Sequence, residues 1–203
     1  MPSAQGFELD SKVLGPLPLV NHFIGRLRFE HFLRKHLPIP DRRVQLAAIP
    51  ALGVLLRNLV VARVPLYSVG EWAGEFAPSV LDLQAPQVCL LNDDRVGRAL
   101  DQLFDADRSS LLTDLVVHMV REFNVELEQF HNDSTTLSLH GEYRGATGTV
   151  VRGKPTVVVT FGNSKEHRPD LKQLLWILTI SADGAIPVHF KVADGNTEDS
   201  TKG

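Results

Sequence analysis

The sequence predicts an α+β protein in which helices fill the front of the chain and strands fill the back. Up to residue 124 the apolar residues recur at spacings of three and four, as they do on one face of a helix. From Val125 onward they alternate with polar residues or form short β-branched runs between glycine-rich turns. We therefore expect a flexible lead-in at 1–16, a helical domain at 17–124 and a β-rich domain at 125–203.

The composition excludes several classes of protein. Of the 203 residues 43% are hydrophobic and 22% are charged, which is ordinary for a globular chain. The net charge of −3 provides no overall basic field, so any DNA binding must come from local basic patches. Cys89 is the only cysteine, which excludes an internal disulfide and a cysteine-based zinc site. Residues 1–10 lack the pattern of a signal peptide, and arginines and a proline interrupt the apolar run 44–64, so we expect a cytoplasmic protein without a membrane span.

Two short helices are predicted between residues 17 and 37, because the phase of the apolar pattern slips near Arg28. Pro38 and Pro40 end this region, since proline cannot continue a helix. The region is also the most basic of the front half. Its cations either form a solvated helix face or contact phosphate. They are Arg26, Arg28, Arg34, Lys35, Arg42 and Arg43.

Further helices are predicted in the rest of the front half. An apolar stripe over 44–63 predicts a buried helix with a kink at Pro50, and Ser68 is expected to cap a short helix that carries Trp72 and Phe76 into the core. Asn92 is the expected N-cap of the next helix. Asp107 or Ser109 then precedes the most strongly periodic helix, 111–123, on which we interpret His118 as structural.

The back half is predicted to contain strands at 125–140, 156–161, 171–181 and 186–192. The glycine-rich segment 141–153 is expected to be a flexible connection, and 162–170 a polar loop. Asp183–Gly184 predicts a tight hairpin turn. A helix is expected to begin near Asp199.

Asp133 lies in the middle of the first predicted strand, where carboxylates are uncommon. If the sheet is covered, the carboxylate also loses hydration. Asp133 is therefore either an exposed strand residue or the start of an Asx-turn, or it is kept to hold a divalent cation.

Four runs in the chain resemble one group of DNA-processing enzymes. The runs are Asp133–Thr136 (DSTT), Gly162–Gln173 (GNSKEHRPDLKQ), Asp183–Pro187 (DGAIP) and Gly195–Asp199 (GNTED). Together they closely resemble bacterial insertion-sequence transposases of the IS-four-like group, whose ribonuclease-H-like domain carries a DDE catalytic site. The front half, including Pro65–Tyr67 and Leu91–Asp101, resembles the helical domain that precedes the catalytic core in that group.

The resemblance implies that Asp133 is the first catalytic acid and a ligand for Mg²⁺ (or Mn²⁺), on the first strand of a ribonuclease-H-like mixed sheet. In the intact family a second Asp and a Glu complete a two-ion site for phosphodiester cleavage and strand transfer. Four other acids, Asp170, Asp183, Asp194 and Asp199, do not match the second position. We therefore expect an incomplete catalytic domain, which would make the chain the N-terminal part of a transposase, inactive alone and unable to hold Mg²⁺ stably.

The loop cations are the candidate DNA contacts, with a solvated loop as the alternative: Lys165, His167, Arg168 and Lys172. The implied partner is DNA at the terminal repeats of an insertion sequence, together with a second copy or an intact transposase, in the bacterial cytoplasm at the nucleoid. The alternative function is a DNA-binding or protein-interaction fragment that modulates an intact transposase. A structural protein with no DNA role is the third reading.

Overall fold

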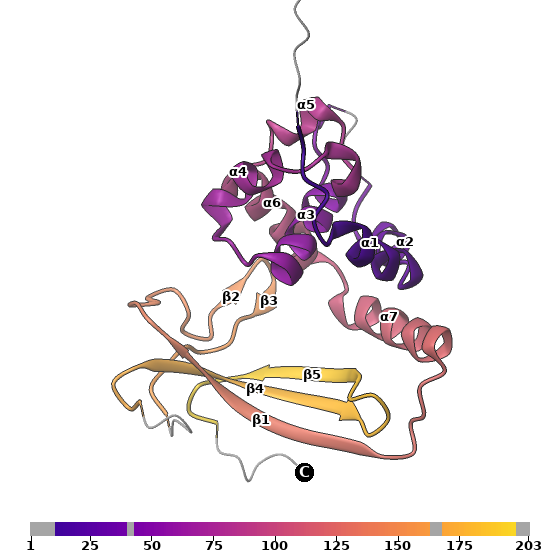
Figure 1. The fold of residues 1–203 in the computed structure, drawn as a ribbon. Coiled ribbons are helices and arrows are strands. Elements are labelled where there is room, and N and C mark those ends of the chain that lie inside the picture. Colours follow the sequence, from indigo (N-terminus) through magenta and orange to yellow (C-terminus); the bar gives the residue numbers. More distant parts are fainter. Residues whose placement is uncertain (1–10, 40–42, 163–167, 198–203) are drawn as a thin grey trace, which may run out of the picture. The chain divides into compact units, whose positions relative to one another are not determined.

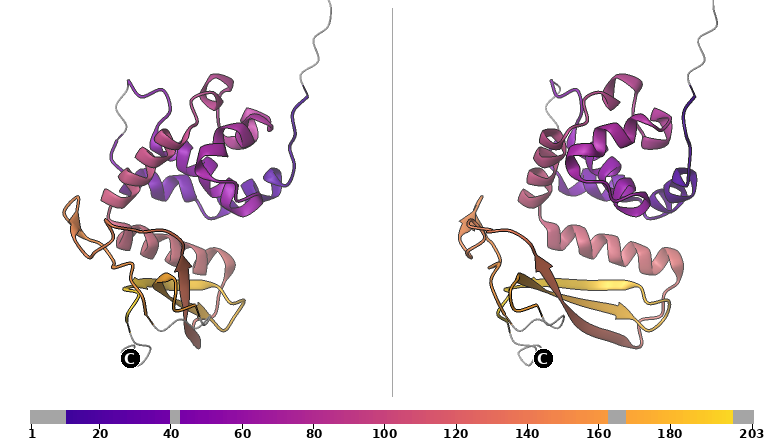
Figure 2. Two further views of the ribbon diagram at one scale, coloured as in Figure 1. Left: turned by 90° about the vertical axis from the view of Figure 1, so that its left-hand side faces the viewer. Right: turned by 60° about the vertical axis from the view of Figure 1, so that its left-hand side comes forward.

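The computed structural model describes residues 11–39, 43–162 and 168–197, and the chain divides into two compact units, Met1–His118 and Met119–Gly203. Within the described residues the first unit is helical and the second contains a small antiparallel sheet (Figures 1 and 2). The protein is therefore of the α+β class, as the sequence predicted.

The described helices are at most 16 residues long. In chain order they are α1 (Leu17–Arg26), α2 (Phe29–His36), α3 (Ala48–Val61), η1 (Leu66–Ser68), α4 (Val69–Gly74), η2 (Pro78–Leu81), α5 (Ala85–Val88), α6 (Asp93–Asp105) and α7 (Arg108–Phe123). The predicted break between α1 and α2 is confirmed, because Arg28 adopts a left-handed conformation with φ of 50°. None of the described helices is by itself long and apolar enough to cross a membrane, and only α3 taken with Leu66–Gly74, a pair bent by 109°, meets that test.

The predicted kink in α3 is wrong. The helix begins at Ala48 rather than at Val44, so Pro50 is its third residue. In the first turn a backbone N–H has no partner within the helix, and proline is tolerated there. At the other end, the fully buried Asn58 side chain binds both the N–H and the carbonyl oxygen of Val64, each at 3.0 Å, and so fixes the chain as it leaves the helix.

Two of the predicted helix caps are confirmed. The Asn92 Oδ1 atom accepts a hydrogen bond from the Arg95 N–H at 2.9 Å at the start of α6. Asp107 precedes α7, and its Oδ1 accepts the Ser110 N–H at 3.1 Å. Ser68 occupies the N-cap position of α4, but its side chain makes no capping bond within the described part of the chain.

The core of the first unit forms where the apolar faces of these helices meet. Trp72 and Phe76 are buried, as predicted, and their ring centroids lie 5.0 Å apart. The structural role predicted for His118 is confirmed, because its Nε2 atom lies 2.8 Å from the Arg26 carbonyl oxygen and its ring lies against Phe32. Each large side chain buried in this way contributes about 1.5–3 kcal/mol to folding.

The described part of the second unit contains β1 (Phe130–Leu139), β2 (Val150–Val151), β3 (Lys154–Pro155), β4 (Lys172–Ser181) and β5 (Pro187–Ala193). The strands β1, β4 and β5 form an antiparallel sheet in that order, and β2 pairs with β3 in a separate ribbon. The predicted strand 171–181 and the hairpin at Asp183–Gly184 are confirmed. In that turn Gly184 has φ of +64° and Ala185 has φ of 52°.

Two predictions for the second unit need correction. The segment 141–153, expected to be a flexible connection, ends in the paired strand β2. Conversely, 156–161 forms only isolated bridges, at Val158 and Thr160, rather than a full strand. The predicted helix start near Asp199 lies outside the described residues.

Candidate functional site

The candidate catalytic residue Asp133 lies near the middle of β1, opposite Leu178 of β4. Its side chain is exposed, whereas Ser134 and Thr136 on the other face of the strand are buried. One carboxylate oxygen accepts the Ser134 N–H at 2.8 Å. The exposed position removes the desolvation cost that a covered sheet would impose on this carboxylate.

The face of the sheet that carries Asp133 is otherwise largely apolar. Because directly paired residues share a face, Leu178 lies beside Asp133, and Trp176 lies on the same face two residues away along β4. Trp176 stacks on Phe190 of β5, with ring centroids 4.7 Å apart and planes at 12°. The carboxylate is thus presented at the border of an aromatic surface.

The three other described aspartates of the second unit make hydrogen bonds within the protein. Asp183 Oδ2 accepts the Glu126 N–H at 3.0 Å, and Asp194 Oδ1 accepts the Val158 N–H at 2.8 Å. Asp170 receives hydrogen bonds from Arg168 at 2.8 and 2.7 Å, and this guanidinium lowers the pKa of Asp170 to about 2. These contacts give each of the three acids a structural role.

The residues that the structure describes do not fit a two-ion site. Among them, no group of three or more His, Cys, Asp or Glu side chains is placed to hold a metal ion. Mg²⁺ in such enzymes is usually bound through carboxylates together with water and substrate phosphates. Asp133, exposed on β1, is the carboxylate that the sequence predicted as the first ligand. Asp199 lies outside the described residues.

Two of the four predicted DNA-contact residues, Lys165 and His167, lie outside the described residues. The other two make contacts within the protein. Arg168 binds Asp170, and the Lys172 ammonium donates to the Glu142 carbonyl oxygen. The role of all four in contacting DNA stays a prediction.

Gly162 and Gly195, the first residues of two of the runs described above, meet at one point beside the start of β4. Gln173 exchanges backbone hydrogen bonds with Thr160, at 2.8 and 3.3 Å, and its Nε2 donates to the Gly195 carbonyl oxygen at 2.6 Å. A Cβ atom on Gly195 would lie 2.6 Å from the Thr160 oxygen, and one on Gly162 would lie 2.9 Å from the Gly195 carbonyl carbon. Both positions therefore require glycine, and two of the four runs that carry the family resemblance, those that begin at Gly162 and Gly195, meet here.

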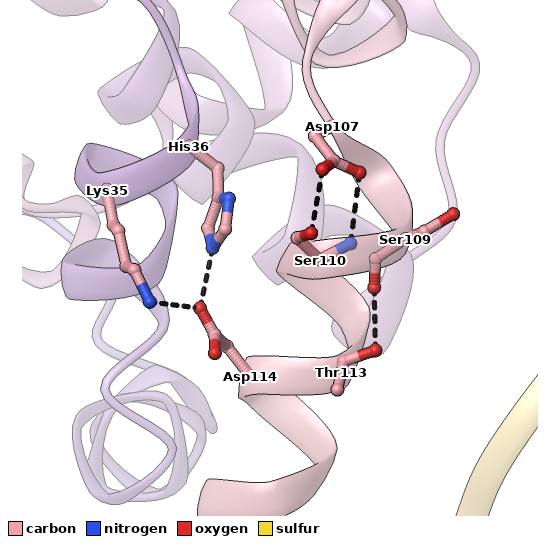
Figure 3. Close-up of polar contacts among 7 residues, drawn as sticks. All are labelled: Lys35, His36, Asp107, Ser109, Ser110, Thr113 and Asp114. Atoms are coloured by element: carbon pink, nitrogen blue, oxygen red, sulfur yellow. Dashed lines mark hydrogen bonds and ion pairs between the residues drawn. The ribbon is translucent and has the colours of Figure 1, made fainter.

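A second polar cluster joins α2 to α7 in the first unit (Figure 3). The Asp114 Oδ2 atom lies 2.6 Å from the Lys35 ammonium and 2.7 Å from His36 Nε2, and these hydrogen bonds hold the pKa of Asp114 below its usual value. Hydrogen bonds from the Ser110 hydroxyl and N–H, at 2.7 and 3.1 Å, likewise lower the pKa of Asp107.

This α2–α7 cluster is a structural tie rather than a catalytic group. The Ser110 hydroxyl donates to Asp107 instead of to His36, so the described atoms do not form a pair of nucleophile and base. Sequence reasoning missed the cluster, because Lys35 and His36 are separated from Asp114 by 79 and 78 residues. No spacing rule links positions so far apart.

The molecule thus combines a helical unit with a small antiparallel sheet that presents a single exposed carboxylate. Residues 9–117, more than half of the chain, match the family described as a domain of unknown function (DUF4277), and the chain belongs to this family. The match lies over the helical part. Neither a curated protein nor a solved structure matches the chain.

Proposed function

We propose that this protein acts in DNA transposition, as a DDE-type transposase or as a part of one. The observation that carries the proposal is the position of Asp133, exposed in the middle of the first strand of an antiparallel sheet that follows a helical domain. The connectivity β1-β4-β5, an antiparallel meander, is the arrangement expected for the opening strands of a ribonuclease-H-like sheet. Domains of the DUF4277 family are common in transposase-like proteins, which also supports the proposal.

The assignment makes Asp133 the first acid of the site. Mg²⁺ or Mn²⁺ is the ion expected for a complete site of this class. Because no group of three or more possible metal ligands lies together among the described residues, we expect this chain alone neither to bind the ion stably nor to cleave DNA. Its place of action in this proposal is the bacterial cytoplasm, on DNA at the nucleoid.

A second candidate function is supported by the same lack of a metal site among the described residues. In this alternative the chain binds DNA or an intact transposase, and modulates transposition without chemistry of its own. The two functions share DNA as a partner, but they differ in whether Asp133 is needed.

Incubation of the full chain with Mg²⁺ or Mn²⁺ and DNA that carries insertion-sequence ends tests the role of Asp133. We expect no cleavage by the chain alone. Cleavage that disappears in Asp133→Ala would support the role of Asp133 and overturn the expected inactivity. Cleavage that persists in Asp133→Ala would contradict the assignment of this residue. A matched control is Asp183→Ala, since the Asp183 side chain binds only the backbone N–H of Glu126 among the contacts described.

A further inference from the structure

Between β1 and β4 the chain makes a two-stranded excursion, residues 141–161, that we call the ribbon arm. Its legs are joined by a series of backbone pairs. Val151 pairs with Lys154, Val150 with Pro155, and Thr147 with Val158. Between these pairs, the Thr149 carbonyl oxygen accepts hydrogen bonds from both the N–H and the hydroxyl of Thr156, at 3.1 and 2.8 Å. Figures 1 and 2 show β2 and β3 set apart from the three-stranded sheet.

Both ends of the ribbon arm are fixed. At the tip, Arg152 and Gly153 connect the strands with φ of 50° and 75°, and two consecutive positive φ values are typical of the tight type I′ turn. At the base, the Val159 N–H donates to the Ala146 oxygen at 2.9 Å, and the Gly195 N–H donates to the Val158 oxygen at 3.0 Å. The arm is therefore a preformed ribbon, and ordering it on a ligand would cost little entropy.

The tip of the ribbon arm is exposed at 150–153, and its cation Lys154 is half-buried. The side chains of Val150 and Val151 are 68% and 43% exposed, an unusual position for two adjacent β-branched residues. The arm carries three cations, Arg144, Arg152 and Lys154. Glu142 is its only acid, and it forms an ion pair with Arg144. By sequence, the arm's three cations and one acid thus give it a net charge of +2 in a protein whose net charge is −3, and Arg152 and Lys154 make further contacts within the protein.

We propose that the ribbon arm is a DNA-binding element, with Arg152 and Lys154 contacting phosphates while the ribbon enters the major groove. The major groove of DNA admits a two-stranded β-ribbon, and apolar side chains such as valine can contact thymine methyl groups there. Cations at the rim of the groove fix the position of the ribbon on the backbone. This inference rests on the proposed role in DNA transposition and assigns that role a contact surface.

The ribbon arm is a poor template for a protein partner that adds a strand. Its strands are two residues long, and Pro155 in β3 has no N–H to donate. Strand addition needs a longer row of backbone donors and acceptors. The charge of the arm complements phosphate, so DNA is the occupant that the observations favour.

The test measures binding of the full chain to a labelled mixed-sequence DNA duplex by fluorescence anisotropy across a salt titration. The variant Arg152→Asn/Lys154→Gln removes both cations, and the resulting Asn-Gly turn retains the left-handed geometry of the tip. Arg121→Gln/Lys191→Gln is the matched control, because it removes two cations from exposed positions outside the arm. Thermal unfolding followed by circular dichroism verifies that both variants are folded.

We expect the ribbon variant to bind more weakly and to lose about 2 from the slope of log K against log salt, because each phosphate contact contributes about 0.9 to that slope. The control should keep the wild-type slope. The charge-preserving variant Arg152→Lys should keep it as well. If the ribbon variant binds with the wild-type affinity and slope, the ribbon inference is overturned while the DNA role stands. If the wild-type chain does not bind DNA even at low salt, both are overturned.

Discussion

Substitution of Gly195 by alanine tests the packing of the second unit. The new Cβ atom would lie 2.6 Å from the Thr160 carbonyl oxygen, and the Gln173 carbonyl oxygen would be closer still. Both neighbours are backbone atoms, so the strain is relieved only if the Thr160–Gln173 pair opens. Loss of its two hydrogen bonds costs about 1 kcal/mol each, and the overpacking itself adds roughly 1 kcal/mol or more.

We therefore expect Gly195→Ala to destabilise the second unit by about 3 kcal/mol, and to lower its unfolding temperature by roughly 10–20 °C for a unit of this size. The measurement is thermal unfolding followed by tryptophan fluorescence in a Trp72→Phe background, where Trp176 of β4 is the only reporter. Gly145→Ala is the control, because a Cβ atom there meets nothing within 4 Å in the described structure. Equal unfolding temperatures for the two alanine variants would refute the reasoning.

Two further predictions concern the first unit. Asn92→Ala removes the side-chain cap of α6 and should lower the free energy of unfolding by about 1 kcal/mol, whereas Asn92→Asp, which keeps the acceptor, should leave it nearly unchanged in urea denaturation. Hydrogen bonds from Lys35 and His36 lower the pKa of Asp114 in the folded protein, so its contribution is present above the ordinary carboxyl pKa of 3.8 and is lost as the pH falls through the lower folded value. Acid titration of stability should therefore be shallower in Asp114→Asn than in wild type below about pH 4, and identical curves would contradict the tie between α2 and α7.

Local signals predicted much of the fold. The slip of the apolar pattern at Arg28 located the turn between α1 and α2, since a helix cannot shift its buried face without breaking. Asn92 was recognisable as a cap because its side chain acts on the next three residues only. The Asp183–Gly184 turn was likewise encoded within two residues.

What the sequence did not reveal depends on contacts between distant segments. The first leg of the ribbon arm, 141–153, was missed because its pairing rests on backbone bonds, and this segment has too few apolar residues for an alternating pattern. Pro50 looked like a kink because the apolar stripe begins at Val44, four residues before the helix does. For the candidate site, the sequence placed Asp183 in a turn and separated Asp170 from the second catalytic position. It did not reveal the partners of Asp114 or the meeting of Gly162 with Gly195.

The most direct test of the central claim is the binding of the full wild-type chain to duplex DNA as a function of salt. A protein of DNA transposition should bind at low salt, with log K falling linearly as log salt rises, because phosphate contacts release counterions. The account predicts this dependence despite the net charge of −3. Absence of binding at low salt, or an affinity that does not change with salt, would contradict it.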